Sequence, residues 1–292
     1  MTASDHLDLT DGGTLISLLQ RHGFSTRKRL GQHFLISRKA LRAIIEACVL
    51  EESAPILEIG PGVGTVTREL AERGAQVTAV EVDAHAVEVL KETVGGFSSV
   101  HVLHGDILTL ALPTLLAGQR WTVVGNLPYY ITTPVIARIL EVTDHVQRAI
   151  FMVQREVADR LQAVPGSKLC GSLSIFVQVY AVVERVTLVP RGAFLPPPSV
   201  DSAVVRLTMR PEPLVPPAQQ QTFFQVVRAA FGQRRKTLEN ALAGGGILHG
   251  DRPALSVALR AAGVAPSVRG ETLSIAEFLR IADAVAQSAV QE

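Results

Sequence analysis

The stretch "PILEIGPGVGT", residues 55–65, places an apolar run directly before a loop that contains three glycines. The run predicts a buried strand, and residues 66–74 after the loop have the apolar spacing of a helix closed by glycine. Glycines between a strand and a helix take positive φ and let the backbone approach a ligand closely. This stretch therefore predicts the first strand of an α/β sheet, with a ligand at its carboxyl end.

Strand and helix patterns alternate along the chain after this loop. Alternation through short loops indicates parallel strands that are joined by right-handed crossovers. We therefore predict an α/β fold with a doubly wound, Rossmann-like sheet. The expected strands are residues 55–60, 76–82, 100–106, 120–126, 148–154, 185–189 and 203–209, and the expected helices are 37–50, 66–74, 84–94, 134–142 and 172–183.

The patterns divide the chain into three parts. Residues 1–22 are typical of a loose N-terminal extension that ends in a short helix, and residues 23–211 form the sheet domain. Two proline-rich stretches lie near the end of that domain, and three consecutive prolines cannot join a central strand. From Gln220 onward the patterns are only helical, so we predict a small helical C-terminal domain over residues 212–292.

The composition fits a globular protein of the cytoplasm. Of 292 residues, 47% are hydrophobic and 19% are charged, and no apolar run approaches the roughly 20 residues that span a bilayer. The acidic, polar start lacks the features of a secretory signal, and Cys48 and Cys170 are typical of buried thiols in a reducing compartment. His101 and His104 have no third ligand nearby, so we expect no metal centre.

The net charge of +1 conceals two segments that contain cations but no acid. Acid-free basic segments in a nearly neutral chain favour a polyanionic partner. A pair of solvated helix faces explains the same charges equally well. The cations are Arg21, Arg27, Lys28, Arg29, Arg38, Lys39 and Arg42 in the first segment, and Arg228, Arg234, Arg235 and Lys236 in the second.

Polar residues close several of the predicted strands. Glu81 stands 21 residues after Gly60, where an acid can hold two ribose hydroxyls, and Asp106 and Asn126 close later strands. Ligands of such sheets lie beyond the carboxyl ends of the strands, so these residues mark a nucleotide site. Glycines for tight packing and acids as helix caps would produce a similar pattern without a ligand.

The glycine loop has the spacing G-x-G-x-G after Glu58, whereas the dinucleotide fingerprint is G-x-G-x-x-G. Thr65 occupies the place of the third glycine in that fingerprint, and no second nucleotide-binding half follows. The loop resembles the first motif of S-adenosylmethionine-dependent methyltransferases. This resemblance implies S-adenosyl-L-methionine as the cofactor in place of NAD.

The turn "NLPY", Asn126 to Tyr129, resembles the catalytic motif of methyltransferases that act on the amino group of adenine. Adenine N6 is a poor nucleophile because its lone pair is delocalised into the ring. Asn126 Oδ1 and the Leu127 carbonyl could accept its hydrogens, and Pro128 restricts the backbone so that this carbonyl is preset. Tyr129 could stack on the base, whereas Tyr130 is left unassigned, with core packing as one interpretation. A proline turn with Tyr129 packed in the core is the alternative.

Together the motifs closely resemble the bacterial ribosomal RNA small-subunit adenine N6-dimethyltransferases, the kasugamycin-resistance family. The resemblance extends from about Lys28 to about Ala284. It is carried by "RKRLGQHFL" (27–35), "LEIGPGVG" (57–64), "VEVD" (80–83), "GDIL" (105–108), "GNLPYYITTPVI" (125–136), "MVQREVADRL" (152–161), "FLPPPSVDSAVVRL" (194–207) and "FGQRRKTLENAL" (231–242).

The resemblance implies roles for individual residues. The family usually has asparagine where this chain has His33, so a cofactor contact there could run through the backbone or through the side chain. Glu81 is implied at the ribose, Asp106 at the adenine amine of the cofactor, and Phe194 on the second face of the target adenine. The implied cofactor contacts are His33, Leu35, Gly60, Glu81, Asp106 and Asn126; the catalytic positions are Asn126, Leu127, Pro128, Tyr129 and Phe194; the RNA-binding positions are Arg27, Lys28, Arg29, Arg234, Arg235 and Lys236.

The implied reaction is dimethylation at N6 of two adjacent adenosines in the 3′-terminal hairpin of 16S rRNA, within an immature small ribosomal subunit. The expected enzyme is a monomer. A macrolide-resistance dimethyltransferase of large-subunit (23S) rRNA would share fold and chemistry, but that family tends to have isoleucine where this chain has Leu127. A ribosome-assembly factor that acts mainly by binding is an alternative of another class, and it need not keep the Asn126 turn intact.

Overall fold

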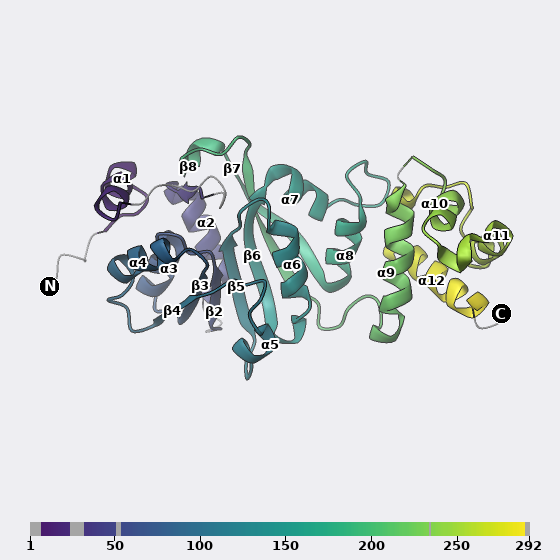
Figure 1. Cartoon of the computed structure of the whole chain (residues 1–292), viewed down its shortest axis with the longest axis horizontal. Helices are drawn as coiled ribbons and strands as arrows, with labels where there is room; N and C mark the ends of the chain where they lie inside the picture. The colour runs from purple at the N-terminus through teal and green to yellow at the C-terminus, as the bar shows by residue number, and fades with distance from the viewer. Residues whose placement is uncertain (1–6, 24–31, 51–53, 234, 290–292) are drawn as a thin grey trace. The chain divides into compact units, whose positions relative to one another are not determined.

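The computed structural model describes residues 7–23, 32–50, 54–233 and 235–289 (Figure 1). The chain splits into two compact units. One contains the β-sheet and the other is helical. None of the described helices combines the length and the apolar character needed to cross a membrane. The sheet unit comprises residues 1–158 and 182–209, and the helical unit comprises residues 159–181 and 210–292.

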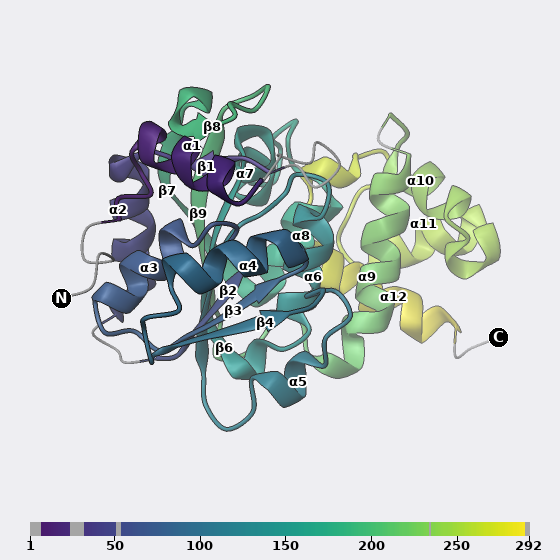
Figure 2. The same cartoon turned by 60° about the vertical axis from the view of Figure 1, so that its left-hand side comes forward.

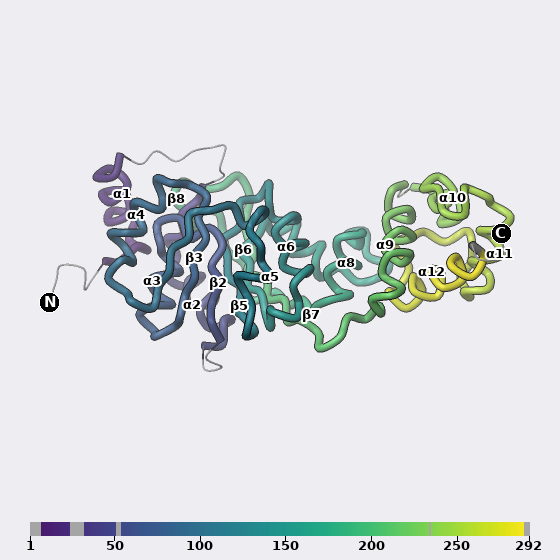
Figure 3. The backbone as a smooth tube through the Cα atoms, turned by 60° about the horizontal axis from the view of Figure 1, so that its bottom comes forward, coloured from purple at the N-terminus to yellow at the C-terminus, as the bar shows by residue number. Residues whose placement is uncertain are grey.

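Seven strands form one sheet in the order β4-β3-β2-β5-β6-β9-β7, and Figure 3 traces several of them side by side. The first five strands in this order are parallel, and β9 is antiparallel to β6. β2 is buried along its whole length, as expected of a parallel strand that is covered on both faces. The doubly wound α/β prediction is confirmed. The strands are β2 (Ile56–Ile59), β3 (Val77–Glu81), β4 (Val100–His104), β5 (Trp121–Asn126), β6 (Val146–Gln154), β7 (Ala181–Val189) and β9 (Ser202–Met209).

Amphipathic helices connect these strands, and Figure 2 shows α3 and α4 running across β2, β3 and β4. The apolar side chains of α2 and α3 share a cluster with the sheet, for example Ile44 and Leu70 with Ile56 and Val124. The connecting helices are α2 (Arg38–Cys48), α3 (Thr65–Glu72), α4 (Ala84–Thr93), α5 (Leu112–Leu115), α6 (Thr132–Leu140) and α7 (Arg155–Leu161), with short 3-10 turns η3 (Thr143–His145) and η4 (Arg191–Ala193).

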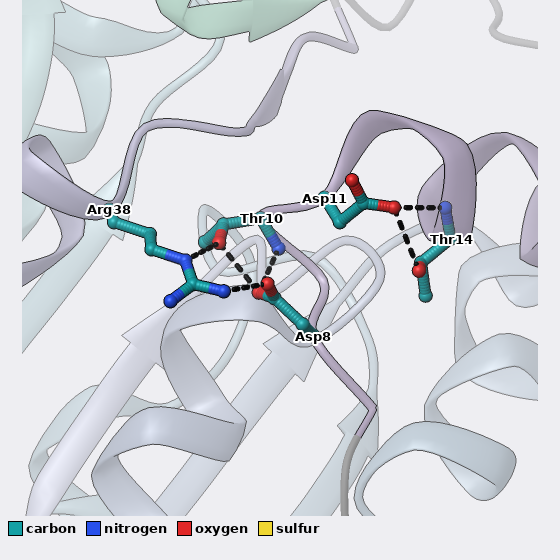
Figure 4. A network of polar contacts seen from close by, with 5 residues as sticks. All are labelled: Asp8, Thr10, Asp11, Thr14 and Arg38. Atoms are coloured by element: carbon teal, nitrogen blue, oxygen red, sulfur yellow. Dashed lines mark hydrogen bonds and ion pairs between the residues drawn. The ribbon is translucent and has the colours of Figure 1, made fainter.

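The N-terminal segment is packed onto the sheet unit, which differs from the loose extension that the sequence predicts. Helix α1 (Gly12–Arg21) buries Leu15 and Leu18 in a cluster with Phe34 and Val63. Outside the helix, a polar network ties the segment to the start of α2 (Figure 4). Polar residues made this segment appear loose, but its leucines recur at helical spacing and find an apolar surface.

The network in Figure 4 joins Asp8 and Thr10, which precede α1, to Arg38, the first residue of α2. Asp11 caps α1 by accepting hydrogen bonds from the Thr14 backbone nitrogen at 2.8 Å and from the Thr14 hydroxyl at 2.9 Å. Asp8 accepts from Thr10 and forms an ion pair with Arg38. These contacts join the residues before α1 to the first residue of α2.

A second, two-stranded sheet joins distant parts of the sequence. β1 (Phe34–Leu35) pairs antiparallel with β8 (Phe194–Leu195), so that Phe34 faces Leu195 and Leu35 faces Phe194 in register. The Ile36 backbone nitrogen extends the pairing by donating to the Ala193 carbonyl at 2.8 Å. Strands of two residues have no measurable period, so the sequence pattern did not predict this pairing.

The helical unit has a core of its own. Phe223 and Phe278 are fully buried in it, together with Ile175 and Val179 of α8. Helix α8 ends at Tyr180, where β7 begins, although the sequence predicted a helix to residue 183. The domain boundary at residue 211 stays a prediction, and α8 shares the core of the helical unit. The helices are α8 (Ser172–Tyr180), α9 (Pro217–Gly232), α10 (Leu238–Gly244), η5 (Ile247–Gly250), α11 (Arg252–Ala261), η6 (Gly270–Thr272) and α12 (Ile275–Ala289).

Candidate active site

One cavity lies at the carboxyl ends of the parallel strands, entirely within the sheet unit. Parallel strands direct their carboxyl ends to the same edge, which is why residues far apart in sequence meet there. The cavity is lined by every residue that the sequence predicted for catalysis or cofactor binding: His33, Leu35, Gly60, Glu81, Asp106, Asn126, Leu127, Pro128, Tyr129 and Phe194. The geometry brings them together, and their individual roles stay predictions.

The glycine loop is held by the acid at the end of β3. Glu81 Oε2 accepts a hydrogen bond from the Gly62 backbone nitrogen at 3.0 Å, and Oε1 accepts from the Asp83 nitrogen at 2.9 Å. Burial raises the pKa of Glu81 above its usual value. Gly60 and Gly62 have φ of 66° and 59°, a region that side chains avoid, so the loop needs glycine at both positions.

A second acid, Glu58, lies deeper in the same cavity. Its side chain is 3% exposed, and Oε2 has no hydrogen-bond partner among the described residues. Burial, followed by the nearby charge of Glu81, raises the pKa of Glu58 to about 8. At neutral pH this residue is therefore a neutral carboxylic acid with an unused polar atom at the cavity wall.

Apolar residues complete the nucleotide end of the cavity. Val82 and Ile107 directly follow Glu81 and Asp106, and both line the cavity. The Val82 side chain is 52% exposed, which is unusual for valine at a strand end. Asp106 is also exposed, with Oδ1 accepting from the Leu108 nitrogen at 2.9 Å. Acids, glycine backbone and exposed apolar surface together fit the ribose, cationic and adenine parts of S-adenosylmethionine.

The turn after β5 leaves two acceptors unused. Asn126 Nδ2 donates to the His33 carbonyl at 2.9 Å, so the amide oxygen, Oδ1, is the atom that remains available as an acceptor. The Pro128 carbonyl accepts from Ile131 N at 3.1 Å and from Thr132 Oγ1 at 3.2 Å. Neither Asn126 Oδ1 nor the Leu127 carbonyl accepts a hydrogen bond from the part of the chain that the structure describes. The two free acceptors therefore belong to adjacent residues at the cavity wall.

Aromatic residues at this turn differ in exposure. Tyr129 is half-buried, and its hydroxyl lies 3.0 Å from Ser202 Oγ. Phe194 is 3% exposed and contributes to the cavity wall from β8. Tyr130 is 57% exposed and also lines the cavity, so packing in the core is the wrong interpretation of this residue.

The structure describes only two of the residues predicted to bind RNA. Arg27, Lys28, Arg29 and Arg234 lie outside the described residues. Arg235 and Lys236 are exposed in the connection between α9 and α10, and neither forms an ion pair with a described residue. In the first basic segment, Arg21 pairs with Glu92 at 2.5 Å and Arg38 pairs with Asp8, so these two cations are already neutralised.

Sequence reasoning missed several residues that line the cavity. Val82 and Ile107 could have been found, because each follows a polar residue that closes a predicted strand. Phe34 and Gln32 lie at a strand of two residues and carry no local signal. Gln32 Nε2 donates to Asp83 Oδ2 at 2.8 Å, a contact that only the folded chain brings about.

Comparison of the sequence with known proteins identifies a single family. The family model described as "Ribosomal RNA adenine dimethylase" matches residues 23–287. The protein "Ribosomal RNA small subunit methyltransferase A" of Geobacillus thermodenitrificans is 42% identical over 287 residues, which is 96% of this chain and 98% of the relative. The protein of the same name from Latilactobacillus sakei is 44% identical over 279 residues, 94% of either chain.

Two solved structures resemble most of the chain. The 23S rRNA methyltransferase ErmE is 30% identical with a TM-score of 0.68, and the match covers 87% of this chain and 100% of that one. A dimethyladenosine transferase from Plasmodium falciparum is 23% identical with a TM-score of 0.73, covering 88% of this chain and 98% of that one. At that identity the second match supports the fold alone.

Proposed function

Because the chain belongs to the ribosomal RNA adenine dimethylase family, we propose that it dimethylates N6 of two adjacent adenosines in the 3′-terminal hairpin of 16S rRNA. The enzyme is an rRNA adenine dimethyltransferase that uses S-adenosylmethionine. Its substrate particle is an immature small ribosomal subunit in the cytoplasm, and it acts as a monomer. The observation that carries this proposal is the pair of unused acceptors at Asn126 and Leu127 on the cavity wall.

Residues at the cofactor end of the cavity are proposed to hold S-adenosylmethionine, which supplies an electrophilic methyl group on a sulfonium when bound. Glu81 would accept the ribose hydroxyls, and Asp106 would accept from the adenine amine. Gly60 lets the backbone come close, and the wall near His33 and Leu35 completes the site. Glu58 offers its unpaired oxygen to the amino-acid part of the cofactor.

The turn prepares the target amine for attack. Asn126 Oδ1 and the Leu127 carbonyl accept its two hydrogens, which orients the nitrogen lone pair toward the methyl group. Leu127 is buried, its nitrogen donates to the Met152 carbonyl at 3.2 Å, and Pro128 restricts the backbone that follows, so the acceptor carbonyl is constrained on both sides. Positioning of this kind accounts for most of the catalysis, because the methylated nitrogen is positively charged and loses its proton readily.

Two aromatic residues hold the target base. Tyr129 stacks on one face of the adenine and Phe194 packs on the other. The two come from the turn after β5 and from β8, and both line the cavity. A base that is extruded from an RNA helix loses its stacking partners, and these rings replace them.

RNA affinity comes from cations outside the cavity. Arg235 and Lys236 are exposed and unpaired within the described chain, which leaves them available to phosphates. Arg27, Lys28, Arg29 and Arg234 are proposed for the same role from the sequence alone. Binding that depends on these residues will weaken as salt concentration rises.

Methylation of 23S rRNA is the nearest alternative. The relatives at 42% and 44% identity are named for the small subunit, whereas the 23S enzyme ErmE matches at 30%. The higher identity over nearly the full chain supports the small subunit. A protein that acts only by binding is disfavoured, because the Asn126 turn and the acids of the cofactor site are all in place in one cavity.

The deciding experiment offers labelled S-adenosylmethionine with 30S or 50S particles that lack the modification, followed by mapping of the methylated bases. We expect label on two adjacent adenosines in the 30S particle and none on the 50S particle. Label on 23S rRNA would replace the proposal with the alternative. Binding of 30S particles without any transfer would identify an assembly factor.

A further inference from the structure

Two contacts converge on the Tyr129 ring, one from His33, which also lines the cavity, and one from Ser202, which does not. The His33 and Tyr129 rings are stacked, with centroids 6.1 Å apart and planes inclined by 28°. The Tyr129 hydroxyl lies 3.0 Å from Ser202 Oγ. The ring is therefore held on one face by an imidazole and at its hydroxyl end by a serine. The three residues come from the segment before α2, the turn after β5 and the start of β9.

His33 is itself fixed by hydrogen bonds at two points. Its Nδ1 lies 2.7 Å from the Pro196 carbonyl oxygen. A carbonyl only accepts, so Nδ1 carries the proton in this contact. The His33 carbonyl in turn accepts from Asn126 Nδ2. Because both the imidazole and the carbonyl of His33 are hydrogen-bonded to the protein, the ring is fixed where it contacts Tyr129.

Ser202 is also fixed by its place in the fold. It is 1% exposed and is the first residue of β9, where it pairs in register with Gln154 at the end of β6. Burial raises the pKa of the Tyr129 phenol, so the hydroxyl stays protonated and can share this hydrogen bond at neutral pH. The neighbouring Tyr130, 57% exposed, makes no ring contact or side-chain hydrogen bond within the described chain. Of two adjacent tyrosines, only Tyr129 is held.

We propose that Ser202 and His33 are positioning residues, which hold the Tyr129 ring in the orientation that stacks on the target adenine. This inference rests on the function proposed above. A tyrosine ring has two rotatable bonds, and a ring that is already oriented loses less freedom when the base arrives. Ser202 does not line the cavity and acts through Tyr129, so its loss impairs use of the RNA and leaves the cofactor site intact. His33 also lines the cavity, so its part in holding Tyr129 is tested by the Tyr129 ring itself.

A double-mutant cycle tests the serine. Ser202→Ala and Tyr129→Phe each remove one partner of the same hydrogen bond, and Tyr129→Phe keeps the ring. We expect each to lower kcat/KM for 30S particles by about tenfold, with an unchanged dissociation constant for S-adenosylmethionine. The double variant should lose no more than either single variant. Additive losses, or a cofactor affinity that changes as much as kcat/KM, would overturn the assignment of Ser202.

The matched control is Ser174→Ala, another buried serine whose hydroxyl donates to the Arg160 carbonyl at 2.5 Å in the helical unit. This variant should lose stability but keep the KM for 30S particles. For His33, the variant His33→Phe keeps an aromatic ring and loses the donor to Pro196, so it should retain more activity than His33→Ala. Equal losses of activity in the two His33 variants would show that the His33 ring does not position Tyr129.

A readout without RNA separates this inference from the proposed function. The chain has three tyrosines, so 3-fluorotyrosine labelling gives three resonances that Tyr→Phe variants assign. Ser202→Ala and His33→Ala should shift the Tyr129 resonance, with those of Tyr130 and Tyr180 unmoved. An unmoved Tyr129 resonance would show that Ser202 and His33 do not hold the Tyr129 ring. A wild-type enzyme that fails to methylate 30S particles would instead refute the proposed function, while the resonances still decide whether Tyr129 is held.

Discussion

Two acidic side chains are buried in the cavity of the sheet unit, whereas basic side chains are exposed in the α9–α10 connection of the helical unit. In the cavity, Glu58 and Glu81 are buried, and Glu81 is bonded to backbone nitrogens. In the connection, Arg235 and Lys236 are exposed and unpaired among the described residues. Buried groups have fixed places and suit the orientation of small reactants, whereas exposed cations suit a large anion of variable contour. We therefore expect substitutions in the cavity to impair methyl transfer or cofactor binding, and substitutions in the connection to impair binding of 30S particles.

The largest effect is expected at the turn. Asn126→Ala removes one of the two acceptors for the target amine, and we expect methyl transfer to fall by about 10²–10³-fold, the range for loss of one preorganised group in an active site. S-adenosylmethionine affinity, measured by calorimetry, should stay within about twofold of wild type, because other residues provide most of that site. Methyl transfer at the parental rate would show that the amide takes no part.

A smaller but still large effect is expected at the cofactor acid. Glu81→Ala removes the acceptor proposed for the ribose hydroxyls and releases the Gly62 nitrogen. We expect the dissociation constant of S-adenosylmethionine to rise by about 10–100-fold, as for the loss of hydrogen bonds to a charged group. Binding of 30S particles, measured without cofactor, should not change. A parallel loss of particle binding would erase the distinction between the two regions.

The reverse pattern is expected in the helical unit. Arg235→Ala combined with Lys236→Ala should weaken 30S binding by about tenfold at low salt, and should reduce the slope of log affinity against log salt by roughly 0.7–0.9 for each phosphate that is no longer neutralised. Cofactor affinity should not change. The matched control removes two exposed cations of α11, Arg252 and Arg260, in the same unit. If the control variant loses as much, the α9–α10 connection has no special role.

A separate effect concerns stability and its dependence on pH, with no change in binding to the RNA. The pKa of Glu58 is raised from 4.5, the ordinary value of a solvated glutamate, to about 8 in the folded protein, which therefore keeps a proton that the unfolded chain releases. This contribution to stability is complete below about pH 4.5 and is lost as the pH rises toward 8, by roughly 1 kcal/mol per pH unit. Urea unfolding between about pH 5.5 and 8 should show a shallower decline for Glu58→Gln, which stays neutral. Identical slopes for wild type and variant would contradict the buried neutral acid.

Much of the fold follows from local pattern. The parallel strands β2 to β6 were predicted within a few residues, because buried strands and amphipathic helices have short, repeated periods. The residues that close these strands were predicted to share one edge, and Glu81, Asp106 and Asn126 do line one cavity. Glycine spacing and the proline of the turn are similarly local, since each acts through the φ angles of its own neighbours.

By itself the sequence determined the order of the elements, the glycine loop, the polar residues at the strand ends and the turn at Asn126. The tertiary structure alone decided that β1 pairs with β8, that α8 joins the helical core, and that His33 contacts Pro196 across a separation of 163 residues. It also decided that Tyr129 is held while Tyr130 is exposed. The physical reason is that a local pattern reports on neighbours within a few residues, whereas burial and long-range hydrogen bonds depend on which surfaces meet when the whole chain folds.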